Sequence, residues 1–172
     1  MNIQLVLPEL SHAAALAAEK NDPLVTRYLG RCALPYTESR ALQDLLVFRS
    51  EEGKKRLSRV ILVEGRPAGM VYGYLPENGQ QSAELGYWLG CVYWGQGIMT
   101  RAAGELCALL FAREEVHRIW ASALKVNIGS WRVMEKLGMR REGDFREAIC
   151  IDGRYYDDLY YGMLRREFTG GK

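Results

Sequence analysis

The sequence has 172 residues, of which 48% are hydrophobic, and its 23 Lys and Arg residues nearly balance 21 Asp and Glu residues to give a net charge of +2. This length predicts one domain, residues 1–172, with ample apolar side chains for a core. The balanced charge argues against nucleic acid as a partner, and the longest apolar stretches fall far short of the roughly 20 residues that a membrane span requires. We expect a soluble, cytoplasmic protein.

The N-terminal part is predicted to contain one strand and three helices. Residues 3–7 predict the strand, and residues 11–20 and 22–29 predict two short helices. Residues 37–53 predict a longer helix. These elements precede a region whose pattern is typical of a sheet.

Three strands follow, and the turn signals between them indicate an antiparallel meander. The strands are predicted over residues 57–63, 68–75 and 83–89, with turns at residues 64–67 and 76–79. The third strand is rich in aromatic residues and alternates two sets of side chains, as a strand with two different faces does.

A glycine-rich loop, YWGQGIMT at residues 93–100, connects the third strand to an amphipathic helix. The first turn of a helix leaves backbone N–H groups without partners and carries about half a positive charge, so it suits an anion. Gly95 and Gly97 would let a phosphate approach that backbone closely. A loop that only packs the helix against the sheet would carry the same glycines, so both interpretations stay open. The helix is predicted from apolar residues at helical spacing, Met99, Ala102, Ala103, Leu106 and Leu110.

Two common phosphate sites are disfavoured by the residues around this loop. A P-loop requires Lys followed by Ser or Thr after its last glycine, whereas Ile98 and Met99 follow Gly97. A dinucleotide fingerprint would have glycine in place of Thr100 and an acidic residue at the end of the next strand, which ends in Ala-Leu-Lys-Val. We therefore expect neither nucleotide hydrolysis nor nicotinamide or flavin binding.

The C-terminal part is predicted to return to the sheet. The connection through the helix makes the strand of residues 117–126 parallel to the strand before the loop, so one βαβ unit lies in an otherwise antiparallel sheet. A short helix follows, with Asn127 as its N-cap and Gly138 at its C-terminus. Residues 139–151 and 154–164 predict a final hairpin. The fold class is therefore α+β, a mixed α/β chain with a mostly antiparallel central sheet.

In this order the motifs resemble those of the GNAT superfamily of acyl-CoA N-acyltransferases. The resemblance rests on the W-G-Q-G-I loop with its flanking strand and helix, the HRI strand, the Asn-x-x-Ser helix start, EKLGM and the DGRYYD hairpin, and it is strong over residues 83–164. Within the superfamily the chain is most similar to the ribosomal-protein alanine and serine N-acetyltransferases. The superfamily's loop pattern is Arg/Gln-x-x-Gly-x-Gly/Ala, from which Trp94 and Met99 depart. The resemblance implies the GNAT fold and acetyl-CoA as the co-substrate.

The resemblance also implies which residues bind acetyl-CoA. Trp88 and Leu89 would offer backbone groups to the pantetheine arm, which pairs with the strand as an extra strand would. Asn127 would hydrogen-bond the same arm through its side chain. As alternatives, Trp88 and Leu89 are plausible core residues and Asn127 is an adequate N-cap without any ligand. Backbone amides of the loop would hold the pyrophosphate, and the residues implied are Gln96, Gly97, Ile98, Met99 and Thr100.

Two side chains are candidates for catalysis. Acetylation requires a neutral amine, but an α-amino group has a pKa of about 7.7–8.0 and a lysine one of about 10.4, so a base must take the proton. Glu84 is the candidate base, because Gly86 on the same strand face leaves space beside its carboxylate; the alternative is a solvated carboxylate at a strand start. Ser130 is the candidate to protonate or hydrogen-bond the departing thiolate, since many relatives use a Tyr where this chain has Met134. A serine that only caps the helix is the alternative.

Cysteines and histidines give little support to a metal site. The chain has two histidines and no CxxC pair, so neither a metal ion nor a disulfide framework is expected. Cys91 lies nearest the presumed site, but the sequence shows no base or orienting partner for it, which disfavours a nucleophilic role. The four cysteines are Cys32, Cys91, Cys107 and Cys150.

The acceptor stays open at the level of sequence. The subgroup resemblance implies a protein N-terminal amine, such as that of a ribosomal protein, while other relatives acetylate polyamines, antibiotics or amino-acid-like amines. A catalytically silent acyl-CoA-binding regulatory protein is a further alternative. Tyrosines of the final hairpin could supply a homodimer contact, namely Tyr155, Tyr156, Tyr160 and Tyr161. Acidic residues on or near the same hairpin could attract a cationic partner or form a solvated face, namely Asp144, Glu147, Asp152, Asp157 and Asp158.

Overall fold

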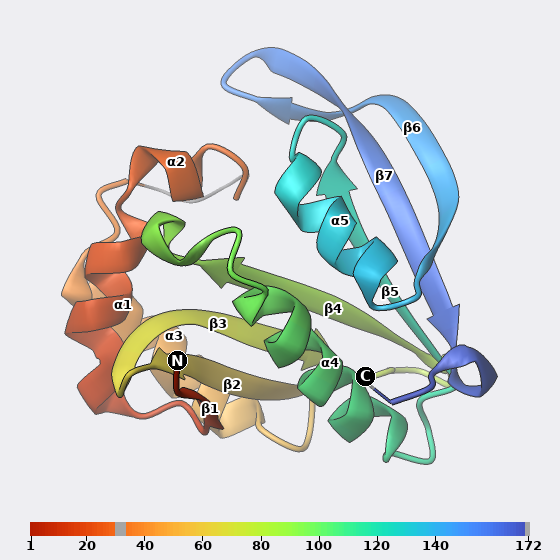
Figure 1. The fold of residues 1–172 in the computed structure, drawn as a ribbon, viewed down its shortest axis with the longest axis horizontal. Coiled ribbons are helices and arrows are strands. Elements are labelled where there is room, and N and C mark those ends of the chain that lie inside the picture. The colour runs from red at the N-terminus through yellow and green to blue at the C-terminus, as the bar shows by residue number, and fades with distance from the viewer. Residues whose placement is uncertain (30–33, 171–172) are drawn as a thin grey trace.

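Figure 1 shows the protein as a computed structural model, which describes residues 1–29 and 34–170. Strands of this part form one sheet in the order β1-β2-β3-β4-β5-β7-β6. Neighbouring strands are antiparallel except β4 and β5, which run parallel. The predicted mixed fold with a single βαβ unit is therefore confirmed. The strands are β1 (Ile3–Val6), β2 (Arg56–Val63), β3 (Arg66–Tyr74), β4 (Ser82–Leu89), β5 (Arg118–Leu124), β6 (Arg140–Ile151) and β7 (Arg154–Leu164).

Helices pack on both faces of this sheet (Figure 1). One face carries the crossover helix between β4 and β5 and the helix after β5, and the other carries helices of the N-terminal part. The helices are α1 (Ala13–Lys20), α2 (Pro23–Thr26), α3 (Glu38–Glu51), α4 (Ile98–Phe111) and α5 (Ile128–Lys136), with short 3-10 turns at Leu10–His12, Cys91–Tyr93 and Arg165–Glu167.

The alternation of side chains along β4 divides the core into two clusters. Leu85 and Leu89 belong to the larger cluster, which lies under α4 and α5, whereas Trp88 belongs to a second cluster with α1 and α3. The apolar stripe predicted for the crossover helix is confirmed, because all its members are buried: Met99, Ala102, Ala103, Leu106 and Leu110.

The two parallel strands in the middle of the sheet pair over only a short stretch. The register of β4 with β5 runs from Ser82–Arg118 to Glu84–Trp120. Because β4 continues to Leu89 and β5 to Leu124, both strands extend past their last pair. Edges that stop pairing present backbone donors and acceptors to whatever enters between them. This opening, called the gap below, leads to the candidate site.

Several predicted boundaries differ from the structure, and two of the differences have a clear physical basis. The helix expected over residues 22–29 is only Pro23–Thr26, although its start is well defined, since the Asp22 carboxylate caps it and a proline occupies the first position. The turn expected over residues 64–67 consists of Glu64 and Gly65 alone, with φ angles of 49° and 77°, and the chain then enters β3. A two-residue turn with both φ angles positive matches the twist of the strands it joins.

No helix in the described part of the chain is long and apolar enough to cross a membrane. Within residues 1–29 and 34–170, no group of three or more His, Cys, Asp or Glu side chains is placed to hold a metal ion. Cys91, Cys107 and Cys150 are free of disulfide bonds, and Cys32 lies outside the described residues.

Candidate active site

A pocket of about 470 Å³ lies where β4 and β5 separate. Its walls are the end of β4, the glycine loop with the start of α4, the first turns of α5, and residues in and just after α2. The structure brings most of the predicted residues together here, while Glu84 and Gln96 are not part of the described lining. The predicted residues that line it are Trp88, Leu89, Gly97, Ile98, Met99, Thr100, Asn127 and Ser130.

The glycine loop presents the N-terminus of α4 to this pocket. Gly95 and Gly97 adopt left-handed φ angles of 73° and 77°, a conformation that favours glycine. Gly97 is the N-cap of α4 and makes no side-chain capping bond, and the first intrahelical bond runs from the Arg101 N–H to the Gly97 carbonyl at 3.1 Å. The amides of residues 98–100 therefore have no intrahelical acceptor, and these residues line the pocket.

The side chains of Trp94 and Gln96 fasten the loop to the end of β4 and to the turn after it. Trp94 Nε1 donates to the Leu89 carbonyl oxygen at 2.8 Å, and Gln96 Nε2 donates to the Val92 carbonyl oxygen at 3.0 Å. The departure of Trp94 from the family pattern thus has a structural role. The Gln96 side chain is engaged within the loop, so its contribution to a ligand would be that of its backbone.

Backbone N–H and C=O groups at the end of β4 point alternately toward β3 and away from it. Gly90 N–H donates to the Ala68 carbonyl oxygen at 2.8 Å, and the direction of bonding alternates along an antiparallel pair. The backbone groups of Tyr87 and Leu89 therefore point away from β3 into the gap, whereas those of Trp88 point toward β3. Leu89 can therefore offer its N–H to a ligand, whereas its carbonyl oxygen already accepts from the Trp94 indole.

Asn127 and Ser130 occupy the first turn of α5. Asn127 is the N-cap residue, as predicted, but its side chain makes no capping hydrogen bond and lies at the pocket. The Ser130 hydroxyl donates to Tyr87 Oη at 3.2 Å, so it is not a capping serine either. Met134, where many relatives place a tyrosine, is buried in the core. Neither polar side chain therefore caps the helix, and both line the pocket.

Glu84 lies at the last pair of β4 with β5, on the sheet face opposite to Ser130. Its side chain is exposed, yet neighbouring groups remove part of its hydration, which raises the pKa of its carboxyl above the ordinary value. The prediction that Gly86 leaves space beside Glu84 is wrong. The ring of Tyr72, the cross-strand partner of Gly86, fills that space, since a Cβ on Gly86 would lie 2.4 Å from it. An amine would have to reach Glu84 past this ring or from the side of Trp120.

Three cations line the pocket that the sequence interpretation missed. They are Arg27, just after α2, and Arg132 and Lys136 on α5, and the pocket lining contains no Asp or Glu among the described residues. Arg132 and Lys136 stand four residues apart on one helix face that also carries Ile128 and Gly129, and this spacing after Asn127 was a usable signal. Arg27 arrives from a distant part of the chain. Together with the α4 N-terminus, these charges suit a ligand with several phosphates.

Cys91 has a partner that the sequence did not reveal. Its thiol donates to Asp22 Oδ2 at 2.9 Å, and this hydrogen bond is the main reason that the pKa of the thiol is raised. A raised pKa keeps the thiol protonated, and the thiolate is the nucleophilic form. The contact therefore ties the turn after β4 to the start of α2 and agrees with a non-nucleophilic role.

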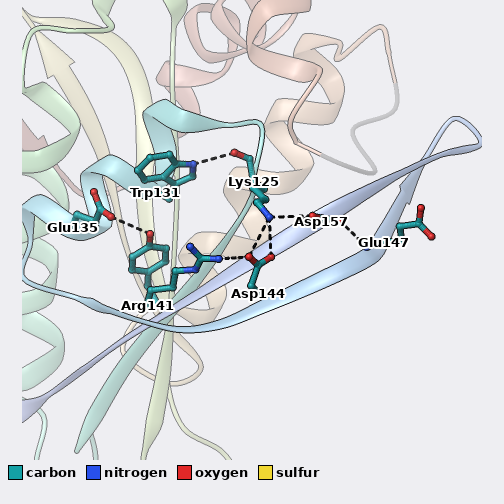
Figure 2. Close-up of polar contacts among 8 residues, drawn as sticks. Lys125, Trp131, Glu135, Arg141, Asp144, Glu147 and Asp157 are labelled. Carbon is teal, nitrogen blue, oxygen red and sulfur yellow. Dashed lines mark hydrogen bonds and ion pairs between the residues drawn. The ribbon is translucent and has the colours of Figure 1, made fainter.

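Two of the five acidic residues expected to form a charged patch on the final hairpin, Asp144 and Asp157, are paired with cations. Figure 2 shows Lys125 Nζ between Asp144 and Asp157, at 3.1 and 3.3 Å, with Arg141 also bound to Asp144. Asp157 accepts from the Glu147 N–H at 3.0 Å, and this bond is the main cause that lowers the pKa of the Asp157 carboxyl. A cationic partner would therefore meet less negative charge than the sequence indicates.

The four hairpin tyrosines do not share one surface. Tyr161 is buried in the core and donates to Glu135 on α5, and Tyr160 stacks on Trp120 with 5.5 Å between ring centroids. Tyr155 is exposed at the end of the hairpin. Tyr160 and Tyr161 thus serve the fold of the chain itself.

The family described as "Acetyltransferase (GNAT) domain" matches residues 2–140 of the chain. The chain therefore belongs to the GNAT acetyltransferase family. This match covers the loop, the gap and the start of α5, the elements that form the pocket.

Among curated relatives, YdaF of Bacillus subtilis is 32% identical over 112 residues, which cover 65% of this chain and 61% of YdaF. The [Ribosomal protein uS5]-alanine N-acetyltransferase of Escherichia coli is 27% identical over 88 residues, which cover 51% of this chain and 45% of that enzyme. The chain thus spans only part of the length of these relatives.

A solved structure has the same fold over nearly the whole chain. The microcin C7 self-immunity acetyltransferase MccE, solved in complex with acetyl-CoA and AMP, superposes with a TM-score of 0.84 at 23% identity, covering 94% of this chain and 92% of that one. At this identity the comparison establishes the GNAT fold.

Proposed function

We propose that the protein is an acetyl-CoA-dependent N-acetyltransferase, formed by one domain over residues 1–172, that transfers an acetyl group to a primary amine by direct attack in a ternary complex. The observation that carries the proposal is the pocket. It combines the N-terminus of α4 with the three cations of its lining and opens onto the unpaired edge of β4. A pyrophosphate suits the first feature and an extended amide-bearing arm suits the second.

The donor would be held mainly by backbone groups. The amides of Gln96, Gly97, Ile98, Met99 and Thr100 would surround the pyrophosphate, and Asn127 would hydrogen-bond the pantetheine arm. Tyr87 would pair with that arm through backbone groups that point into the gap, and Leu89 would offer its N–H to the thioester end of the donor, while Trp88 supports the strand from its other face. Arg132 and Lys136 would neutralise phosphate charge at the α5 wall.

The reaction needs a neutral amine and a stabilised leaving group. Glu84 would take the proton of the attacking amine, directly or through water, and its raised pKa brings this base closer to the pKa of the amine. The Leu89 N–H, which points into the gap, would stabilise negative charge on the thioester oxygen. Ser130 would donate a hydrogen bond to the departing thiolate. Glu84 and Ser130 lie on opposite sheet faces, so amine and donor would meet through the gap.

For the acceptor we propose a protein N-terminal amine, such as that of a ribosomal protein. The relative from Escherichia coli, whose name gives ribosomal protein uS5 as its substrate, supports this class. The exposed position of Glu84 also suits a chain end that reaches in from outside. Acetyl-CoA and such acceptors meet in the cytoplasm, where we expect the protein to act. A small-molecule amine as the acceptor, or a silent acyl-CoA-binding protein, is the alternative.

Release of free CoA from acetyl-CoA tests the proposal. The purified protein is assayed with peptides that begin with Ala or Ser, with the same peptides acetylated at the N-terminus, and with polyamines, aminoglycosides and amino acids. We expect turnover with the free peptides and none with the acetylated ones. Turnover confined to small amines would overturn the protein acceptor, and binding of acetyl-CoA without turnover on any amine would overturn the enzyme.

A further inference from the structure

Tyr87 and Ser130 form a hydrogen-bonded pair between β4 and the first turn of α5. The Tyr87 hydroxyl donates to the Ser130 carbonyl oxygen at 2.8 Å, and the Ser130 hydroxyl donates to Tyr87 Oη at 3.2 Å. The two residues stand 43 positions apart, and both line the pocket. Because β4 and β5 no longer pair at this level, the contact closes one side of the gap.

These two bonds fix the direction of both hydroxyl protons. A phenol has one proton, and here the Ser130 carbonyl accepts it, so the phenol oxygen is left as an acceptor. A serine hydroxyl can otherwise occupy three staggered positions around its Cα–Cβ bond. The bond to Tyr87 selects the position that directs the hydroxyl toward β4, the strand along which the pantetheine arm is expected.

We propose that Tyr87 is a positioning residue for Ser130, which holds the serine hydroxyl toward β4 and influences the reaction only through that hydroxyl. The inference rests on the proposed function, because that function makes the departing thiolate the partner of Ser130. When the bond between carbonyl carbon and sulfur breaks, its electron pair stays on sulfur. The Ser130 O–H then turns from Tyr87 Oη to sulfur as a hydrogen-bond donor, and no proton leaves either residue in this step.

The surroundings of Tyr87 explain why it would position rather than donate a proton itself. Its ring packs against the larger core cluster, and this burial raises the pKa of the phenol well above its ordinary value. A phenol with such a pKa stays protonated while a thiolate leaves. Its hydroxyl proton is also directed at a backbone carbonyl rather than at the pocket.

A double-mutant cycle tests the inference. Tyr87→Phe keeps the ring and removes the hydroxyl, and we expect kcat to fall roughly tenfold while the KM for acetyl-CoA stays within about twofold. Ser130→Ala should lower kcat at least as much. In the Ser130→Ala background Tyr87→Phe should have no further effect on kcat, because the hydroxyl it positions is gone.

Tyr161→Phe is the matched control. Tyr161 also donates a hydrogen bond to a residue of α5, Glu135, at 3.2 Å, but it lies on β7, and the described part of the chain shows no hydrogen bond between it and Ser130. If holding α5 were the whole effect, Tyr161→Phe would lower kcat as Tyr87→Phe does; we expect it to keep the wild-type kcat. Melting temperature and acetyl-CoA affinity, measured for every variant, separate loss of fold from loss of positioning.

Three results would overturn the inference. They are an unchanged kcat in Tyr87→Phe, losses that multiply in the double variant, and equal losses in the two Tyr→Phe variants. Failure of the proposed function looks different, because wild-type protein would then release no CoA with any amine. If wild-type protein turns over and Ser130→Ala keeps full kcat, the role of Ser130 fails and the inference fails with it.

Discussion

The proposed donor side and the proposed acceptor side of the gap are built in different ways. On the donor side, residues 87–100 and 126–136 supply most of the pocket wall, with backbone amides, a helix N-terminus and two cations. On the acceptor side, Glu84 is exposed beside Tyr72, and Trp120 stacks on Tyr160 of the last strand. The proposed donor side thus depends largely on backbone groups, whereas the proposed acceptor side depends on side chains from separate strands.

Glu84→Gln, on the proposed acceptor side, should have the largest effect on kcat. We expect kcat to fall about 100-fold below the pKa of the acceptor amine and less above it, because a neutral amine then needs no base. The pKa of Glu84 is raised. As the pH falls, Glu84 should therefore become protonated, and so inactive as a base, at a higher pH than an ordinary glutamate would. In the variant this acidic limb of the pH profile should be replaced by one at the pKa of the acceptor amine, because only the neutral amine then reacts, while the KM for acetyl-CoA stays the same.

Glu77→Gln, an exposed acid in the turn before β4, is its control and should behave as wild type. An unaltered rate in Glu84→Gln would remove Glu84 from the mechanism. A changed KM for acetyl-CoA would mean that the two sides of the gap are not independent.

Arg132→Gln combined with Lys136→Gln should weaken the binding of acetyl-CoA and leave the acceptor side unaffected. We expect the KM for acetyl-CoA to rise roughly tenfold with kcat nearly unchanged, because each cation would contact phosphate in the ground state as well as in the transition state. Raising the ionic strength should reduce the difference in this KM between the variant and the wild type. Arg146→Gln combined with Arg154→Gln, two exposed positions on the hairpin, is the charge-matched control. A fall in kcat without a change in KM would contradict this assignment.

Gly97→Ala should separate backbone strain from ligand binding. Gly97 has a φ of 77°, so an alanine there should cost about 1 kcal/mol of unfolding free energy, measured by denaturant titration. The Gly153→Ala variant at a φ of 78° in the hairpin turn should cost the same, and a Cβ meets no neighbour within 4 Å at either position. Only Gly97→Ala should also raise the KM for acetyl-CoA, by a few fold. Equal KM values in both variants would count against the loop as the pyrophosphate site.

Lys125→Met should have the smallest effect. It removes the exposed ion pairs to Asp144 and Asp157 (Figure 2), so we expect a slightly lower melting temperature that approaches that of wild type in high salt. Turnover of a free N-terminal peptide should be unchanged. A large loss of kcat, with the fold intact, would show that the acceptor side depends on how the hairpin is held.

The sequence predicts what is local and misses what is assembled across the sheet. The stripe of α4, the glycine loop and the N-cap position of Asn127 depend on spacing within one element, and the structure has them where they were expected. The environment of Glu84 was missed because it depends on the register of β3 with β4, which places Tyr72 over Gly86. No pattern within β4 contains that information.

The missed polar partners have the same cause. Cys91 bonds to Asp22 across 69 residues, and Tyr87 to Ser130 across 43. Such pairs follow from the packing of whole elements, so composition and periodicity cannot reveal them. Arg132 and Lys136 could have been found from their spacing on one helix face, whereas Arg27 could not.

The short pairing of β4 with β5 has a consequence for stability. The sheet has a seam there, between β1 to β4 on one side and β5 to β7 on the other, crossed by the ladder from Ser82–Arg118 to Glu84–Trp120. An arm bound along β4 would fill that seam and protect the amides of Tyr87 and Leu89 from hydrogen exchange. Acetyl-CoA would then serve as an added strand as well as a reactant, and resistance to heat should rise with its concentration.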